Sequence, residues 1–368
     1  MLPVETLSRL LRPAGGGVHL VSTGKAEQLA LQRALYGASD ETEVAARWRA
    51  DLARAASARA VLLGIPSDAG GGFQRGANLA PAALRARLVE AHGPRLSAAR
   101  EAGLVDLGDV FVVPQLLHDE MLSPAQREAT AAALYPGLPA AERAALPVSP
   151  LSIARRALEL VLAVNPQARV IALGGDHSTA WPVVEALAAV RPGLAIVQVD
   201  AHTDLLPERL GVRYCFGTWS FHASRLVGPA RLVQVGIRAS GHDRSYWERT
   251  EGVRQLWAEE VRADPVAALE AIVAQLRGAG ARSVYFSNDI DGTDAAHADA
   301  TGTPEPGGLE PNFVTALVRR LATDVGLAGG DIMEVAPLVA RSTGGGPRTV
   351  ALAAGYLMET IEASLGGR

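Results

Sequence analysis

The chain has 368 residues, of which 48% are hydrophobic and 20% charged, with a formal net charge of -4. This composition is typical of a globular protein and, without a basic excess, does not favour nucleic-acid binding. No apolar run approaches the ~20 residues that span a bilayer, and a single cysteine, Cys215, excludes an internal disulfide. Since the N-terminus also lacks the features of a signal peptide, we expect a cytoplasmic protein without a membrane partner.

The first 58 residues are predicted to form a helical N-terminal extension. Asp40 followed by Glu43 is typical of a capping box at the start of a helix. Val44, Trp48 and Leu52 then recur at helical spacing and form one apolar stripe. We interpret this stripe as a packing face and not as a cofactor contact.

Short apolar strands alternate with helical stretches from about residue 59 onward. The candidate strands are residues 60–65, 104–107, 170–173, 194–200, 232–237, 284–287 and 331–335. Between them, helical spacing marks residues 153–163, 182–189 and 265–276. This alternation predicts a parallel sheet that is covered by helices on both faces. We therefore expect one α/β domain over residues 59–368.

A proline-rich stretch at about residues 113–150 interrupts this alternation. A helix is predicted within it at residues 124–134. Loops of this length in a compact domain are often functional or form an interface. We interpret the stretch as an insertion over the sheet edge or over the functional site.

Acids and histidines directly follow three of the candidate strands. The segments read Gly-Gly-Asp-His-Ser at 174–178, Asp-Ala-His-Thr-Asp at 200–204 and Asp-Ile-Asp at 289–291. Alternate residues of a strand share one face, so the acids of each segment point the same way. Converging carboxylates would repel one another without cations, whereas two divalent ions would nearly balance their charge. Carboxylate and imidazole ligands suit Mn²⁺, Zn²⁺, Fe²⁺ or Ni²⁺.

This pattern predicts a pair of metal ions at the carboxyl ends of parallel strands, where ligands bind in such sheets. Two ions about 3.5–4 Å apart can share a water and make hydroxide near neutral pH. That hydroxide would attack an electrophilic carbon or phosphorus. Glu334 should lie at the same edge, and a carboxylate that is not needed for metal suits a guanidinium with its paired N–H donors.

These motifs resemble those of the ureohydrolase family, which includes arginase, agmatinase and related guanidino-group hydrolases. Further matching motifs are Ser-Asn-Asp-Ile-Asp-Gly-Thr-Asp at 287–294, Thr-Gly-Thr-Pro at 301–304 and Asp-Ile-Met-Glu-Val at 331–335. The segment Gly-Ile-Pro-Ser-Asp-Ala-Gly at 64–70 resembles the first strand and loop of the family. The resemblance spans about residues 60–365, with the motifs in the order of the family.

The resemblance implies a three-layer α/β/α sandwich around an eight-stranded, mainly parallel sheet, assembled as a homotrimer or homohexamer. It implies two divalent ions per chain, Mn²⁺ or Ni²⁺, with the ligands His177, Asp200, His202, Asp204, Asp289 and Asp291. Asp204 would also pass a proton from the bridging hydroxide to the leaving nitrogen, and Glu334 would bind the guanidinium group. The implied reaction hydrolyses a C–N bond of a small guanidino substrate and releases urea. A metal-loading accessory protein is a further candidate partner.

Two positions depart from the patterns of relatives. Leu205 and Leu206 follow the second metal motif, where arginases carry a polar residue that helps to hold the α-carboxylate of arginine. Phe216 stands where agmatinases carry the histidine that is often credited with proton relay. His222 is close in sequence and is either a replacement for that histidine or an ordinary surface or core residue. Free arginine is therefore not the expected substrate.

An aromatic cluster follows, since Phe216, Trp219 and Phe221 lie close together in a chain with only 5% aromatic residues. The cluster is either core packing or the wall of a compact pocket that faces a cation. On the second interpretation Phe216, Thr218 and Trp219 are candidate substrate contacts, and guanidine itself is the preferred substrate. Agmatine or a guanidino acid is the alternative. Cys215 is interpreted as buried packing.

Two functions from other classes remain open at this point. A deacetylase of the same general fold would use one zinc with three protein ligands. His177 and the second pair of acids argue against it, and one metal per chain would favour it. The other alternative is a non-catalytic subunit that stabilises an active paralogue. The complete ligand set argues against that role, whereas a chain that binds no metal would favour it.

Overall fold

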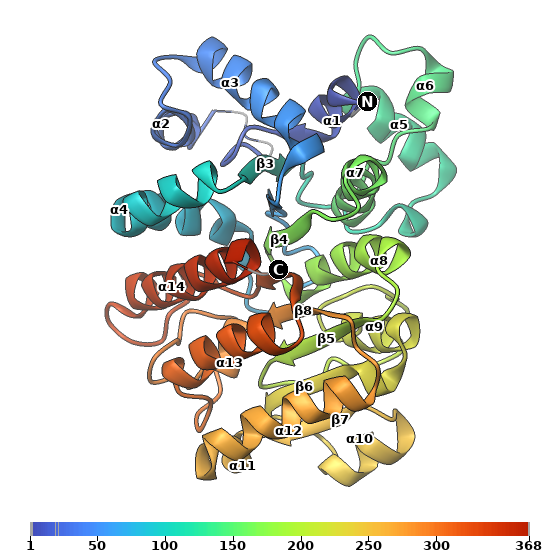
Figure 1. Ribbon diagram of the computed structural model, residues 1–368. Helices are drawn as coiled ribbons and strands as arrows, with labels where there is room; N and C mark the ends of the chain where they lie inside the picture. The colour runs from blue at the N-terminus through green and yellow to red at the C-terminus, as the bar shows by residue number, and fades with distance from the viewer. Residues whose placement is uncertain (1–2, 19, 21, 367–368) are drawn as a thin grey trace.

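Figure 1 shows the computed structural model of the chain, which describes residues 3–18, 20 and 22–366. The described residues form a nine-stranded sheet. Its strands are β1 (Leu11–Arg12), β2 (Ala60–Gly64), β3 (Leu104–Val110), β4 (Arg169–Leu173), β5 (Leu194–Val199), β6 (Leu232–Ile237), β7 (Arg254–Trp257), β8 (Ser283–Asn288) and β9 (Leu327–Ile332). They lie in the order β1-β3-β2-β4-β9-β8-β5-β6-β7, and β1 alone pairs antiparallel.

Helices cover both faces of the sheet, because its central strands are buried on both sides and need apolar partners above and below. One hydrophobic cluster packs under α1 (Val4–Leu10), α3 (Glu41–Arg54), α7 (Pro150–Val164), α8 (Ala180–Val190) and α9 (Trp219–Val227). The other packs under α4 (Ala80–Glu101), α11 (Ala258–Ala263), α12 (Pro265–Gly278), α13 (Pro311–Asp324) and α14 (Gly345–Gly366). In Figure 1, α7, α8 and α9 lie to the right of the strands and α4, α14 and α13 to the left. The predicted three-layer α/β/α architecture is confirmed.

The strands differ from the prediction in number and in one boundary. Eight parallel strands are present as expected, and the short antiparallel β1 adds a ninth. The predicted strand at 331–335 is placed too late, because β9 ends at Ile332. Its sequence Leu-Ala-Gly-Gly-Asp-Ile lacks a continuous apolar run, so the pattern did not show where the strand begins. Residues 254–257 were not predicted as a strand, because β7 is a four-residue edge strand that begins with arginine and glutamine.

The N-terminal residues pack against one edge of the sheet through α1, β1, α2 (Lys25–Tyr36) and α3. Asp40 caps α3 by accepting a hydrogen bond from the Glu43 N–H, as predicted. The expected packing face is also confirmed, since Val44, Trp48 and Leu52 are buried and the Trp48 indole donates to the Leu107 carbonyl at 2.9 Å. The boundary at residue 58 stays a prediction, and residues 1–2 and 367–368 of the two predicted domains lie outside the described residues.

The proline-rich stretch forms α5 (Pro124–Leu134) and α6 (Ala140–Ala144) beside α1 and α7 (Figure 1). The predicted helix at 124–134 is confirmed, with a capping box between Ser123 and Gln126. The Asp119 carboxylate accepts hydrogen bonds from the Val148 and Ser149 N–H groups, which ties the start of the stretch to its end. The remaining helix α10 (Arg244–Thr250) precedes β7. None of the described helices combines the length and the apolar character needed to cross a membrane.

Candidate metal centre

Four neighbouring strands at the middle of the sheet deliver the predicted site residues. The order β4-β9-β8-β5 places the carboxyl ends of these strands side by side. His177 follows β4 in a one-turn 3-10 helix, Asp200 follows β5 directly, and Asp289 follows β8. Because parallel strands end at a common edge, segments more than a hundred residues apart in the sequence meet there.

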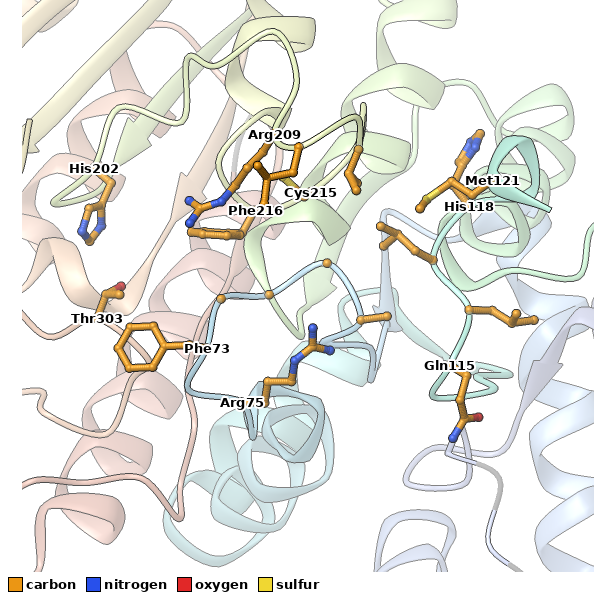
Figure 2. A pocket seen from close by; sticks show the side chains of 18 of the residues that line it. Phe73, Arg75, Gln115, His118, Met121, His202, Arg209, Cys215, Phe216 and Thr303 are labelled. Atoms are coloured by element: carbon orange, nitrogen blue, oxygen red, sulfur yellow. The ribbon is translucent and has the colours of Figure 1, made fainter. Parts of the chain in front are cut away.

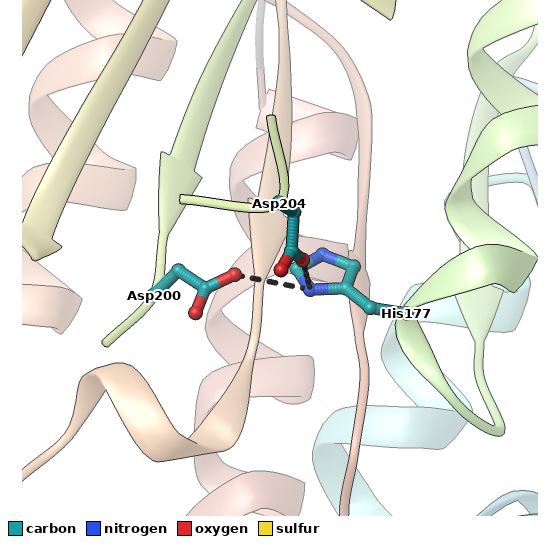
Figure 3. A group of neighbouring side chains, drawn as sticks. All are labelled: His177, Asp200 and Asp204. Carbon is teal, nitrogen blue, oxygen red and sulfur yellow. Dashed lines mark ion pairs between the residues drawn. The ribbon is translucent and has the colours of Figure 1, made fainter. Parts of the chain in front are cut away.

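Two groups of three side chains at this edge could each hold a metal ion, and they share Asp200. They are His177, Asp200 and Asp204, and Asp200, His202 and Asp291, with the potential ligand atoms of each group within 4.8 Å of one another. Figure 3 shows the first group, with the imidazole of His177 pointing at the two carboxylates. A carboxylate that belongs to both groups is suited to bridge two ions. Five of the six predicted ligands are therefore brought together in two adjoining groups.

The imidazole of His177 is oriented as a metal ligand. Its Nε2 lies 3.0 Å from Ser287 Oγ, and that hydroxyl donates to the Asp331 carboxylate at 2.9 Å. Ser287 therefore accepts from Nε2–H, which leaves the lone pair of Nδ1 free. Holding the second ring nitrogen in this way sets the tautomer and the ring plane of a metal-binding histidine.

The free nitrogen of His177 faces three carboxylates. Nδ1 lies 3.2 Å from Asp200 Oδ2, 3.4 Å from Asp204 Oδ2 and 3.1 Å from Asp289 Oδ2. It is buried and makes no hydrogen bond with any described residue. A lone pair and three carboxylate oxygens that converge in this way fit a divalent cation between them. On the other side, His202 Nδ1 lies 3.1 Å from Asp291 Oδ2.

The electrostatics of the centre also favour the binding of cations. Burial raises the pKa of Asp204 and of Asp289 well above the usual value, and the neighbouring carboxylate of Asp200 raises both further. Burial alone would lower the pKa of His202, but Asp291 and Asp200 raise it to about 12. Without metal the cluster would therefore retain protons that two divalent ions would displace.

Glu334 lies at the same edge, two residues after β9, as its motif predicted. Its Oε1 accepts a hydrogen bond from the His177 N–H at 2.8 Å. Burial raises the pKa of this carboxyl well above the usual value, and the charge of Asp176 adds to the effect. Glu334 and Asp204 have φ angles of 61° and 52°, in the left-handed region that non-glycine residues rarely adopt. Such backbone conformations cluster at functional sites, where the surrounding structure maintains them.

A small inner cavity of about 20 Å³ lies directly over the centre. Its lining includes the carboxylates of Asp204, Asp289 and Glu334, the imidazole of His202 and the ring of Phe216. A wider outer cavity of about 780 Å³ adjoins it and shares His202, Thr303, Phe73 and Phe216 with it. The shared lining places the two cavities next to each other beside the predicted metal ligands.

The outer cavity has a basic character (Figure 2). Arg209 lies against the ring of Phe216, with its guanidinium carbon 5.0 Å from the ring centroid, and Arg75 projects from the glycine-rich loop nearby. The far wall of the outer cavity comes from the start of the proline-rich stretch, through residues 115–118, 121 and 122. No acidic side chain of the described residues lines this outer cavity.

The predicted substrate contacts separate into one cavity residue and two residues behind it. Phe216 lines both cavities. Thr218 is buried in its own turn, where its hydroxyl accepts from the Cys215 N–H and donates to the Arg213 carbonyl. Trp219 is fully buried and donates from its indole to Asp204. Neither residue is among those that line the outer or the inner cavity, and direct substrate contact by Thr218 and Trp219 stays a prediction.

The other aromatic and histidine positions also lie away from the centre. Phe221 and His222 pack edge to face, and His222 Nε2 lies 3.0 Å from the Arg213 carbonyl oxygen. His222 is not among the residues that line the inner or the outer cavity. Cys215 is buried as expected and lines the outer cavity. Leu205 is buried, whereas Leu206 is partly exposed.

Several cavity residues were missed by the sequence analysis. They are Phe73, Arg75, His118, Arg209 and Thr303. Thr303 belongs to the 301–304 motif and donates to Asp291 Oδ2 at 3.1 Å, so that motif was the available signal. The glycine run 70–72 before Phe73 was a second signal, since the Gly70 carbonyl accepts the Phe216 N–H at 3.1 Å. Nothing in the local sequence marks His118 or Arg209.

Known proteins match this chain over most of its length. A family model described as the arginase family matches residues 58–362. Proclavaminate amidinohydrolase from Streptomyces clavuligerus is 33% identical over 288 residues, which cover 76% of this chain and 80% of that protein. A solved structure of that enzyme is similar with a TM-score of 0.63 and 31% identity, and covers 83% of this chain and 92% of its own.

Two further relatives match a shorter part. Agmatinase from Bacillus subtilis (strain 168) is 35% identical over 167 residues, which cover 45% of this chain and 55% of that protein. Guanidinobutyrase from Pseudomonas aeruginosa is 36% identical over 171 residues, which cover 45% of this chain and 53% of that protein. The match therefore spans about half the length of these two relatives.

Proposed function

The chain belongs to the arginase family of binuclear-metal amidinohydrolases, and from this premise we propose that it hydrolyses guanidine, or another compact guanidino compound, to urea. The observation that carries the proposal is the pairing of two ligand groups through Asp200 beneath a small cavity that Glu334 also lines. A single-zinc deacetylase would need neither the second group nor Glu334.

The carboxylate and imidazole donors fit two divalent ions, and we propose Mn²⁺ or Ni²⁺. When bound, such ions lower the pKa of a water molecule between them and thereby supply a nucleophile near neutral pH. The ligands would be His177, Asp204 and Asp289 on one side and His202 and Asp291 on the other, with Asp200 shared.

The protein's own side chains would then bind and orient the substrate. Glu334 offers its carboxylate to the paired N–H donors of a guanidinium, which is the geometry that strengthens such contacts. Asp204 lines the same cavity, so its carboxylate would be placed to accept a proton and pass it to the leaving nitrogen. The indole of Trp219 keeps that carboxylate in place from behind.

The size of the inner cavity supports guanidine as the preferred substrate. Phe216 and Phe73 line this narrow cavity together with the predicted metal ligands, so a long substrate would have to extend into the outer cavity. A guanidino acid is the second candidate, because Arg75 and Arg209 line the outer cavity and could pair with a distal carboxylate. Agmatine carries a distal ammonium, which would meet these two arginines and no acid of the described lining.

The assembly and location also remain proposals. A homotrimer or homohexamer is expected from the family. A cytoplasmic location is consistent with a single cysteine, which is buried. A metal-loading accessory protein is a further proposed partner.

The test is urea release from guanidine, methylguanidine, 4-guanidinobutyrate, agmatine and arginine, with Mn²⁺ and Ni²⁺ loaded separately. Guanidine should have the highest kcat/KM and arginine the lowest. Metal content measured on the same samples should be two ions per chain. One ion per chain with no urea from any substrate would instead support the deacetylase, and no bound metal would support a non-catalytic subunit.

A further inference from the structure

Three buried glutamines stand in a row on adjacent strands beside the metal centre. Gln198 on β5 pairs in register with Gln234 on β6, which pairs in register with Gln255 on β7. All three are fully buried. They lie among apolar strand residues, where a buried amide is costly unless its hydrogen bonds are made.

The side chains of this glutamine row form one continuous chain of hydrogen bonds. The Trp257 indole donates to Gln255 at 3.0 Å, and the Gln255 amide donates to Gln234 at 2.8 Å. The Gln234 amide donates to Gln198 at 2.8 Å, and the Gln198 amide donates to Asp200 Oδ2 at 2.7 Å. Every donor points the same way, from the edge of the sheet toward the shared metal ligand.

The chain of donors ends on the one carboxylate that belongs to both ligand groups. Asp200 Oδ2 takes the Gln198 amide and faces His177, while Oδ1 accepts the His202 N–H at 2.6 Å. The carboxylate is thus held from two sides, with one oxygen turned to each ligand group. Hydrogen bonds to an ionised acceptor are stronger than neutral ones, and aligned bonds in a buried chain polarise one another.

Cohesion of the sheet does not explain this arrangement. Apolar side chains would pack at these three positions without any need for partners. The Gln198 carbonyl oxygen also accepts from the Ser220 hydroxyl at 2.6 Å, so the amide is held in the orientation that aims its N–H₂ at Asp200. Packing therefore leaves two features unexplained: the common direction of the hydrogen bonds, and the fact that they end at Asp200.

We propose that the glutamine row is a positioning device for the metal bridge: Gln198, oriented by Gln234 and Gln255, holds the Asp200 carboxylate so that each oxygen serves a different ion. The inference rests on the proposed binuclear centre. It assigns no catalytic role to the glutamines, which act only through Asp200.

The test measures Mn²⁺ binding and the exchange-coupled electron paramagnetic resonance signal of a Mn²⁺ pair, in the full-length protein without substrate. Gln198→Met removes the donor at similar size, and Gln198→Glu replaces the donor by an acceptor. Both should weaken binding of at least one Mn²⁺ by about 10-fold or more and reduce the coupled signal. Gln255 is three hydrogen bonds away from Asp200, so Gln255→Met should weaken Mn²⁺ binding and the coupled signal to a smaller extent. Gln32→Met, at a buried glutamine that bonds to the Pro13 carbonyl, is the matched control and should change neither.

The outcomes separate the two claims. If the wild-type protein binds no pair of Mn²⁺ ions, the binuclear centre itself is wrong. If it does, and the Gln198 and Gln255 variants unfold at lower temperature but keep wild-type Mn²⁺ affinity and coupling, the glutamine row is only structural and the inference is overturned. Because Gln255→Met lies farthest from Asp200, it keeps the test open should Gln198 variants fail to fold.

Discussion

The indole nitrogen of Trp219 lies 3.0 Å from Asp204 Oδ2, and the same indole stacks on the His177 imidazole with ring centroids 4.5 Å apart. One fully buried side chain therefore contacts two potential ligands of the same metal group. The indole N–H can donate only, so it favours the ionised form of Asp204 and fixes which oxygen remains for metal and substrate.

Replacing this tryptophan should lower turnover without emptying the site. Trp219→Phe keeps an aromatic ring against His177 but removes the donor to Asp204. We expect kcat to fall by about 10- to 100-fold, with a smaller change in KM and two metals still bound. Steady-state kinetics and metal analysis measure this. Trp247→Phe removes another buried indole, which donates to Ser240, and serves as the control. Equal losses in both variants would assign Trp219 to packing alone.

Removing a ligand should instead empty at least part of the site. Asp289→Ala deletes a carboxylate whose Oδ2 is 3.1 Å from His177 Nδ1. The remaining acids can no longer balance two divalent ions, so we expect at least one metal to be lost together with nearly all turnover. Metal analysis after gel filtration, with circular dichroism to confirm folding, measures the loss. Wild-type activity in this variant would contradict the binuclear centre.

The ligands could be predicted from sequence because each depends on short-range order. Each ligand motif directly follows a recognisable apolar strand, and the carboxyl ends of parallel strands meet at one edge of the sheet. The motifs are therefore expected together, although Asp200 to Asp204 lie beyond β5 and do not follow strand alternation. The partners of these ligands could not be predicted in the same way. Trp219 meets Asp204 only through the way α9 begins, and Ser287 meets Asp331 only through the pairing of β8 with β9.

The glutamine row also could not be predicted from the sequence. Each glutamine alone is an ordinary polar residue in a strand, and Gln255 lies in a strand that the apolar pattern did not reveal. Only the registers of β5, β6 and β7 align the three amides. Likewise, Arg209 reaches the outer cavity from a loop after β5, and no periodic pattern reports where a loop side chain points.

The carboxylate of Glu334 should be needed for substrate and not for metal. In Glu334→Gln the side-chain oxygen can still accept the His177 N–H, which it accepts at 2.8 Å in the native protein. The fold and both metals should therefore persist. The amide cannot offer a paired anionic acceptor to guanidinium, and kcat/KM should fall by about 100-fold or more. If the variant loses metal before it loses substrate affinity, Glu334 supports the metal centre.

The metal-free protein should become less stable as the pH rises above about 6.5. The pKa values of His177 and His202 are raised in the folded state, to about 12 for His202, by the carboxylates around them. Between the unfolded pKa near 6.5 and these folded values, the folded state binds more protons than the unfolded state. The free energy of unfolding then falls as the pH increases. Its derivative with respect to pH has the sign of the number of protons bound by the unfolded state minus the number bound by the folded state.

Thermal unfolding in chelator at pH 6.5, 7.5 and 9 measures this trend. With Mn²⁺ present the trend should reverse, since metal displaces these protons and binds more tightly at higher pH. The double variant His177→Asn and His202→Asn should weaken the dependence in chelator without abolishing it, because the raised pKa values of Asp204 and Asp289 contribute with the same sign. A metal-free Tm that rises with pH would show that the histidines are not held in protonated form.

Charge in the outer cavity should decide among substrates of different length. Arg209 is exposed and rests on the Phe216 ring, with its guanidinium carbon 5.0 Å from the centroid. It lines the outer cavity and not the inner one, in which the guanidinium head of the substrate is proposed to bind. Arg209→Glu should lower kcat/KM for 4-guanidinobutyrate and raise it for agmatine, each by about 5-fold, since exposed charge pairs contribute up to about 1 kcal/mol. Guanidine has no distal group, so its kcat/KM should stay the same. Arg49→Glu makes the same charge change on α3 and should alter none of the three. If the wild-type protein prefers agmatine, the tail of the substrate does not approach Arg209. Arg209→Glu would then leave unchanged the ratio of kcat/KM for agmatine to kcat/KM for 4-guanidinobutyrate.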